Sequence, residues 1–306
     1  TPAPTPAPTP APTPAPTPAP TPVPKVSPAP AAKAAAKEKP KTEQRSYDAT
    51  KLAPGVYALI TRPGGRATSN GFFVEGDDYV LAGGAHMTKE AIEDLAAAVA
   101  AVTSKPIRYF VLPHHHRGYT AVDFDFPPGW DLVMSWQVWQ ALSDEVRPVT
   151  ASTLFFGDGL TLKLGRLSVI LTNVGKAHTE GDALVFIPEA GVLFASDLLY
   201  TKSVGFMGDG HMQDWVLALD FMEKLNPQAV IPGHGPVGTG RAISEFKNYF
   251  KEFLTAILKH IEAGDSLEQT LAKLELKDYR EYEGYKQFLK INAERAYKQL
   301  KGGQEP

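Results

Sequence analysis

Apolar and polar residues follow patterns that predict short strands first, then a helix, then a buried strand. Strands are expected at residues 55–61, 71–74 and 78–82, separated by Gly-rich turns. Apolar positions recur at helical spacing over residues 89–104. The run 107–112 (IRYFVL) is apolar enough to be a strand buried on both faces.

The second half of the chain repeats this order. A helix is expected over residues 212–224, followed by a strand at 229–231, and an amphipathic helix then carries the stripe from Ile243 to Ile261. Ser266 and Gln269 match a capping box, and a last helix is expected to run to about Leu300. The strands predicted before these helices cover residues 160–164, 167–172, 183–187 and 192–196.

Residues 123–158 are less regular and predict a packed insertion, with a helix near 134–143. Strands, a helix and a further strand precede this insertion. The same order of elements follows it, and the chain then ends in helices. This order indicates an α/β (α+β) fold in which two sheets pack together between helical layers.

Composition divides the chain into three parts. Residues 1–47 are rich in Thr, Pro and Ala and predict a disordered, extended spacer, because proline fixes φ and donates no backbone hydrogen bond. Residues 48–262 have the composition of a globular domain, and residues 263–306 predict a C-terminal helical extension.

Charge and cysteine content exclude several classes of partner and site. The net charge is −3 without a basic patch, which disfavours nucleic acid as a partner, and no apolar run is long enough for a transmembrane segment. The absence of cysteine excludes disulfides and thiolate ligands. Because the numbering opens on Thr, we expect an export signal to precede it, and the spacer suits a periplasmic or secreted protein.

Candidate chemistry lies where the predicted strands give way to loops. His114 and His116 follow the strand 107–112, whereas His178 lies in a polar loop between two apolar strands. Asp197 ends a buried strand, and His234 lies between two glycines. Imidazoles and a carboxylate from successive strand ends indicate a transition-metal site, most often zinc. His115 is expected to point away from it.

The order of these residues resembles the metallo-β-lactamase superfamily, whose motif His-x-His-x-Asp-His is followed by a distant His, Asp and His. The segments AHTEGDALVFIPE, GVLFASD and VIPGHGP look like its third, fourth and fifth ligand segments. The tail ending NAERAY looks like that of periplasmic relatives grouped with quinoprotein and sulfur-oxidation systems. The resemblance implies a four-layer αββα metallo-β-lactamase-like sandwich and a metal-dependent hydrolase of small molecules.

The departures from this motif define the predicted site. Gly118 and Tyr119 stand where the family has Asp and His, and Ala82-Gly83-Gly84 replaces its Asp-x-Gly turn. The resemblance therefore implies one complete zinc site of His114, His116 and His178, and a partial second position of Asp197 and His234.

Two readings of this incomplete site remain open. In the first, the chain is a zinc hydrolase of an ester, thioester, amide or phosphoester, in which Asp197 orients water and Tyr119 donates to an oxyanion. In this reading, Asp123 or Asp125 is a further candidate for the lost carboxylate. In the second, the chain is a catalytically inactive pseudoenzyme or binding protein that retains the fold.

Overall fold

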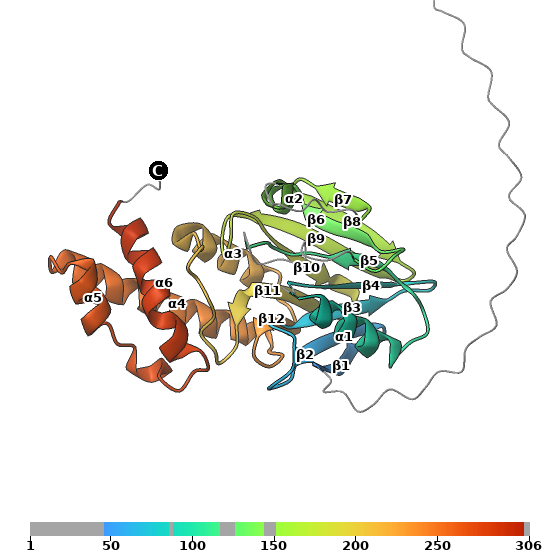
Figure 1. Ribbon diagram of the computed structural model, residues 1–306, viewed down its shortest axis with the longest axis horizontal. Helices are drawn as coiled ribbons and strands as arrows, with labels where there is room; N and C mark the ends of the chain where they lie inside the picture. Colours follow the sequence, from blue (N-terminus) through green and yellow to red (C-terminus); the bar gives the residue numbers. More distant parts are fainter. Residues whose placement is uncertain (1–45, 86–87, 117–125, 144–150, 303–306) are drawn as a thin grey trace, which may run out of the picture. The chain divides into compact units, whose positions relative to one another are not determined.

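The computed structural model describes residues 46–85, 88–116, 126–143 and 151–302. They belong to one compact unit, Gln44–Pro306. The strands of this unit form a seven-stranded and a five-stranded sheet (Figure 1).

The seven-stranded sheet keeps its strands in chain order. It is antiparallel from β1 to β4 and parallel from β4 to β7. Helix α1 (Lys89–Ala100) connects β4 to β5, and helix α2 (Trp136–Ser143) connects β6 to β7. The strands are β1 (Tyr47–Ala53), β2 (Val56–Thr61), β3 (Gly71–Glu75), β4 (Val80–Gly84), β5 (Ile107–Val111), β6 (Asp131–Ser135) and β7 (Thr153–Phe156).

The five-stranded sheet has the order β12-β11-β10-β9-β8. Its neighbours are antiparallel except for β11 and β12, which are parallel and are connected through helix α3 (Met212–Lys224). The strands are β8 (Gly159–Leu164), β9 (Leu167–Gly175), β10 (Asp182–Ile187), β11 (Val192–Tyr200) and β12 (Ala229–His234).

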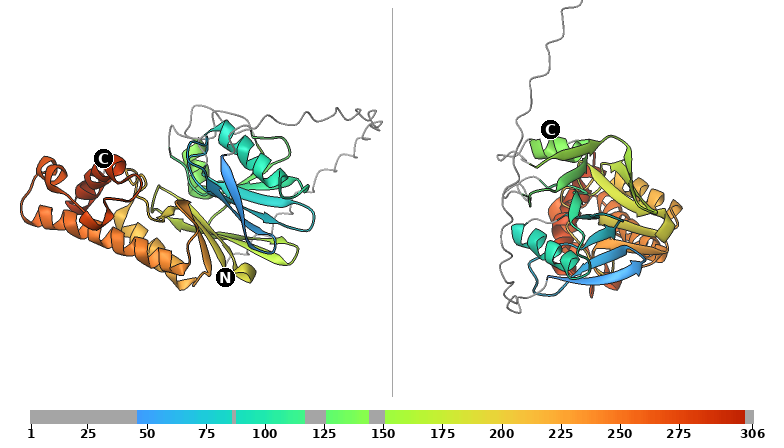
Figure 2. Two further views of the ribbon diagram at one scale, coloured as in Figure 1. Left: turned by 90° about the horizontal axis from the view of Figure 1, so that it is seen from below. Right: turned by 90° about the vertical axis from the view of Figure 1, so that its right-hand side faces the viewer.

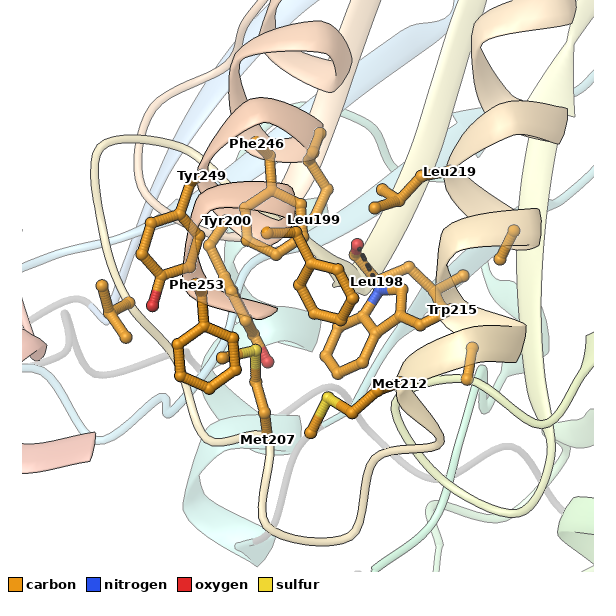
Figure 3. Packing of buried hydrophobic residues seen from close by; sticks show 14 of the residues in the cluster. Leu198, Leu199, Tyr200, Met207, Met212, Trp215, Leu219, Phe246, Tyr249 and Phe253 are labelled. Carbon is orange, nitrogen blue, oxygen red and sulfur yellow. Dashed lines mark hydrogen bonds between the residues drawn. The ribbon is translucent and has the colours of Figure 1, made fainter. Parts of the chain in front are cut away.

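Three apolar clusters hold the layers together. One joins α1 and α2 to the outer face of the larger sheet, and a second fills the space between the sheets. The third joins the smaller sheet to α3, α4 (Gly240–Glu262) and α6 (Tyr285–Leu300), around Trp215 (Figure 3). In the left view of Figure 2, orange α4 meets the sheets at one end, on the side away from teal α1. The predicted αββα sandwich is confirmed.

The sequence patterns of the helices match their packing. In α1, the side chain of Thr88 accepts a hydrogen bond from the Ala91 N–H, and the buried residues Ile92, Leu95 and Val99 share one face. Helix α5 (Leu267–Lys273) begins with the predicted capping box of Ser266 and Gln269. No helix among the described residues is long and apolar enough to cross a membrane.

The predicted insertion is wrong in one respect. Residues 131–135 and 153–156 form β6 and β7, which extend the larger sheet by parallel pairing, so the predicted helix begins only at Trp136. The strand β1 was also not predicted, because four of its residues, from Asp48 to Lys51, are exposed and polar or small.

Candidate metal centre

Ring nitrogens of His114, His116 and His178 converge beyond the ends of β5 and β9. One nitrogen of each ring lies within 4.8 Å of those of the other two, and all three residues are buried. The Nε2 atoms of His116 and His178 are 2.8 Å apart. This group could hold a metal ion.

The backbone before His114 passes from one sheet to the other. The Leu112 N–H donates to the Val133 carbonyl of β6 at 2.9 Å, which continues the larger sheet by one residue. The next carbonyl, that of Pro113, accepts from the Ala183 N–H of β10 at 2.8 Å. This crossing places His114 and His116 beside the loop between β9 and β10, which carries His178.

The loop that carries His178 is closed by Asp182. The Asp182 carboxylate accepts from the Thr179 N–H at 2.8 Å and from the Thr179 hydroxyl at 3.0 Å. Burial raises the pKa of Asp182 to about 7, although both bonds from Thr179 favour the charged form. The turn is therefore fixed locally, by a carboxylate that does not belong to the three-imidazole group.

The second ring nitrogens of His116 and His114 face polar partners. Nδ1 of His116 lies 2.8 Å from Oδ2 of Asp209, and this hydrogen bond lowers the pKa of the Asp209 carboxyl. Nδ1 of His114 lies 3.4 Å from Oγ of Ser196. A partner at Nδ1 selects the tautomer whose Nε2 lone pair is available to a metal.

His178 has its partner in a buried tyrosine. The Tyr200 hydroxyl donates to the Phe206 carbonyl at 2.8 Å, so its oxygen can accept from Nδ1–H of His178 at 3.2 Å. The Trp215 ring packs edge-on against His178 with centroids 5.2 Å apart. The orientation of His178 is therefore fixed by one hydrogen bond and one aromatic contact.

Asp197 faces the imidazoles from β11. Its Oδ2 lies 3.7 Å from Nε2 of His114, 3.8 Å from Nε2 of His178 and 3.5 Å from Nε2 of His234. Its Oδ1 is buried and has no hydrogen-bond partner among the described residues. An orphaned buried carboxylate oxygen beside converging imidazoles fits a cation, because a buried charge requires a counter-charge.

The protonation states suit metal binding. Burial lowers the pKa of His114 to about 3 and that of His178 well below its usual value, so both rings are neutral at neutral pH. Burial opposes ionisation of Asp197, but the neighbouring His234 outweighs this effect and lowers the pKa of Asp197. Burial likewise disfavours the charged form of His234, but the Asp197 carboxylate raises the pKa of His234.

Comparison with known proteins identifies the family. The family model described as "Metallo-beta-lactamase superfamily" matches residues 96–234, the segment that carries all five predicted ligands. This segment of the chain, residues 96–234, belongs to the metallo-beta-lactamase superfamily. Within this superfamily, the chain is 33% identical over 82 residues to "Metallo-beta-lactamase type 2" of Bacillus sp. (strain 170), and 32% identical over 82 residues to the protein of that name from Bacillus cereus. Each match spans 25% of this chain and 32% of the relative.

Solved metallo-beta-lactamase structures share the fold. The "Metallo-beta-lactamase from Pontibacter korlensis" superposes with a TM-score of 0.57 at 20% identity, over 67% of this chain and 99% of that one. The DIM-1 metallo-beta-lactamase gives a TM-score of 0.57 at 18% identity, over 68% of this chain and 98% of that one.

The predicted site residues fall into three groups in this metallo-beta-lactamase fold. The structure brings His114, His116 and His178 together, with Asp197 and His234 beside them. Asp197 lies inside β11 rather than at its end, because the strand continues to Tyr200 past Ser196, whose φ is 49°. Tyr119 lies outside the described residues, as do Gly118, Asp123 and Asp125.

Sequence patterns did not reveal the residues that support this site. Asp209 was missed, although an acidic residue between Gly208 and Gly210, shortly after a ligand strand, is a signal that could have found it. Asn70 was also missed: its Nδ2 donates to the carbonyls of Pro232 and Gly235 at 3.0 and 2.8 Å, on both sides of His234. Nothing in the sequence around Asn70 points to a loop 162 positions away.

Gly233 leaves room for the Asp197 carboxylate. A Cβ at Gly233 would overlap Oδ1 of Asp197 and lie 2.8 Å from its Cα. We expect Gly233→Ala to displace the carboxylate, to cost about 1–3 kcal/mol of unfolding free energy and to weaken any metal binding at this site roughly 10-fold. Urea unfolding of the metal-free protein and zinc titration measure the two effects.

Gly157→Ala is the matched control, because a Cβ at Gly157 meets nothing within 4 Å. It should leave both quantities unchanged. If the two variants had the same free energy of unfolding and the same metal affinity, the close contact of Asp197 with Gly233 would contribute to neither.

Proposed function

We propose that the protein is a zinc-dependent hydrolase. In this proposal, His114, His116 and His178 hold one zinc ion, whereas Asp197 and His234 form an incomplete second position. The observation that carries it is the convergence of three buried imidazoles beside the buried Asp197 carboxylate, whose Oδ1 has no hydrogen-bond partner among the described residues. A bound zinc ion lowers the pKa of a coordinated water to about 7 and polarises a carbonyl or phosphoryl oxygen.

The chain's own residues supply binding, orientation and charge. Asp209 and Tyr200 fix the ring planes of His116 and His178, so that the Nε2 atoms stay directed at one point. Asp197 carries a negative charge within 3.8 Å of the rings of His114, His178 and His234. In this position its carboxylate can accept a proton or orient a water molecule. We propose Asp197 as the catalytic carboxylate and a small molecule with an ester, thioester, amide or phosphoester bond as the substrate.

Elemental analysis and hydrolysis assays test this function together. Protein purified without added metal should contain about one zinc per chain, and p-nitrophenyl acetate, a thioester, a β-lactam and a phosphodiester form the substrate panel. Activity on at least one of them should disappear with a chelator and return with zinc. Stoichiometric zinc without turnover of any substrate would contradict catalysis and favour a binding protein. Absence of metal would contradict the site itself.

We propose a periplasmic or extracellular location, in which the Thr/Pro/Ala-rich N-terminal segment serves as a spacer and ends before Ser46 and Tyr47, which are buried in the folded unit. Thr-Pro-Ala-Pro repeats over residues 1–24 support this proposal, because such segments are extended and resist compaction. Cell fractionation of the native producer, with antibodies against residues 46–302, tests the location. Detection in the cytoplasmic fraction alone would contradict it.

A further inference from the structure

Helix α6 binds the loop that supports the metal centre. The loop, residues 201–211, joins β11 to α3 and carries both Phe206 and Asp209. Three side chains of α6, those of Asn292, Arg295 and Gln299, recur at positions i, i+3 and i+7, which places them on one helix face. All three hydrogen-bond to backbone groups of this loop or of the residue that follows it.

Asn292 secures the first half of the loop. It is fully buried, and its Oδ1 accepts from the Met207 N–H at 2.7 Å while its Nδ2 donates to the Gly205 carbonyl at 2.9 Å. These two bonds lie on both sides of Phe206. A single amide side chain therefore fixes the backbone from which the Phe206 carbonyl is presented.

Arg295 and Gln299 secure the second half. Arg295 Nε donates to the Gly210 carbonyl at 2.8 Å, and its Nη2 reaches the Asp209 carbonyl at 3.4 Å. Gln299 Nε2 donates to the same Gly210 carbonyl at 2.9 Å, and its Oε1 accepts from the Met212 N–H at 2.9 Å. The backbone on both sides of Asp209 is therefore held by α6.

The same loop directs its other groups at the imidazoles. The Asp209 carboxylate accepts from Nδ1 of His116, and the Phe206 carbonyl accepts from the Tyr200 hydroxyl, whose oxygen faces Nδ1 of His178. The Phe206 ring also packs edge-on against His116 with centroids 5.6 Å apart. Two of the three imidazoles thus obtain their orientation through a loop whose backbone is bound by α6.

We propose that α6 positions the metal centre, with Asn292, Arg295 and Gln299 as positioning residues that act through Asp209 and Tyr200. The inference rests on the proposed metal binding and adds that the C-terminal helix, remote in sequence from the His cluster, sets the affinity and geometry of that site. Losing an outer partner of a metal-bound histidine typically weakens affinity 10–100-fold. Freeing the loop should have a comparable effect, because it loosens the partners of two histidines at once.

The test uses the full chain stripped of metal by a chelator. Asn292→Leu keeps the branched shape of the side chain and removes its hydrogen bonds to Met207 and Gly205. Gln299→Met likewise removes the hydrogen bonds to Gly210 and Met212, at a half-buried position near the end of the helix. Zinc affinity is measured by competition with a chromophoric chelator, and the Co²⁺ absorption spectrum reports the coordination geometry. Lys298→Ala is the control, because Lys298 lies on the same helix, is exposed and pairs only with Glu294 among the interactions of the described residues.

We expect zinc affinity to fall about 10–100-fold in Asn292→Leu and in the same direction, by a smaller factor, in Gln299→Met. The Co²⁺ spectrum should change in both, whereas Lys298→Ala should match the wild-type chain. In a double-variant cycle, Gln299→Met should lower zinc affinity by a smaller factor in the Asp209→Ala background than in the wild-type chain. The reason is that the Asp209 side chain, through which Gln299 acts on His116, has already been removed. If Asn292→Leu does not fold in the metal-free state, the double-variant cycle of Gln299→Met with Asp209→Ala tests the role of α6 by itself.

Wild-type affinity and an unchanged Co²⁺ spectrum in the folded variants would overturn the role of α6 and leave the proposed function intact. Additive effects in the cycle would equally overturn the route through Asp209. Failure of the wild-type chain to bind either ion would instead contradict the proposed function, and this inference with it.

Discussion

Replacing His116 with alanine should abolish zinc binding and every zinc-dependent activity of the protein. His116 is the central residue of the group: its Nε2 lies 2.8 Å from that of His178, and its Nδ1 contacts Asp209. Loss of a ligand exceeds the 10–100-fold weakening that follows the loss of an outer partner. Zinc content after dialysis, together with turnover on the substrate panel, measures the effect.

His260→Ala provides the control for this prediction. His260 lies near the end of α4 and pairs with Asp265, away from the three-imidazole group. It should leave zinc content and turnover unchanged while removing the same number of atoms. Retention of one zinc per chain by His116→Ala would show that the three imidazoles do not form the site.

Trp215→Ala should produce the largest loss of stability. Trp215 is fully buried, and its Nε1 donates to the Leu198 carbonyl at 3.1 Å (Figure 3). Its ring also packs against Phe250 with centroids 5.3 Å apart. Truncation leaves a large cavity and an unpaired carbonyl, for an expected cost of about 3–5 kcal/mol. Denaturant unfolding of the metal-free protein, monitored by circular dichroism, measures it.

A neighbouring position gives the matched comparison. Leu217 lies on the same helix, but it is 65% exposed, so Leu217→Ala should change the free energy of unfolding by less than about 0.5 kcal/mol. Because the Trp215 ring contacts His178, the tryptophan variant should also bind zinc more weakly. Similar stability of the two variants would contradict the assignment of Trp215 to the core.

The fold was predictable where each element carries its own pattern. Helix α3 was predicted with its observed bounds, Met212–Lys224, because Met212, Trp215, Leu219 and Met222 recur at helical spacing and face a single cluster. Strand β7 was missed because Leu154 and Phe155 are exposed at a sheet edge, so the strand lacks the alternation that marks a half-buried one. Pairing with β6 stabilises it instead, and that contact is not encoded locally.

The ligand candidates were predictable because each lies at or just beyond the end of a predicted strand, and their order resembles a known ligand motif. His114 and His178 could be proposed in this way, although they are 64 positions apart and follow strands of different sheets. Their supporting residues could not. Asp209 and Tyr200 each act through one hydrogen bond to a histidine far away in the sequence. The periodicity of apolar residues along the sequence does not indicate such a bond. Asn292 is more remote still, since its side-chain hydrogen bonds go to the backbone of an intervening loop.

The hydrogen bond from Ala183 to the Pro113 carbonyl joins the two sheets at the proposed metal centre. It ties the segment leading to His114 directly to the strand that follows His178. An ion held by both segments would strengthen the same junction, because a ligand that binds only the folded state stabilises that state. Binding of zinc should therefore raise the resistance of the two sheets to separation at this edge.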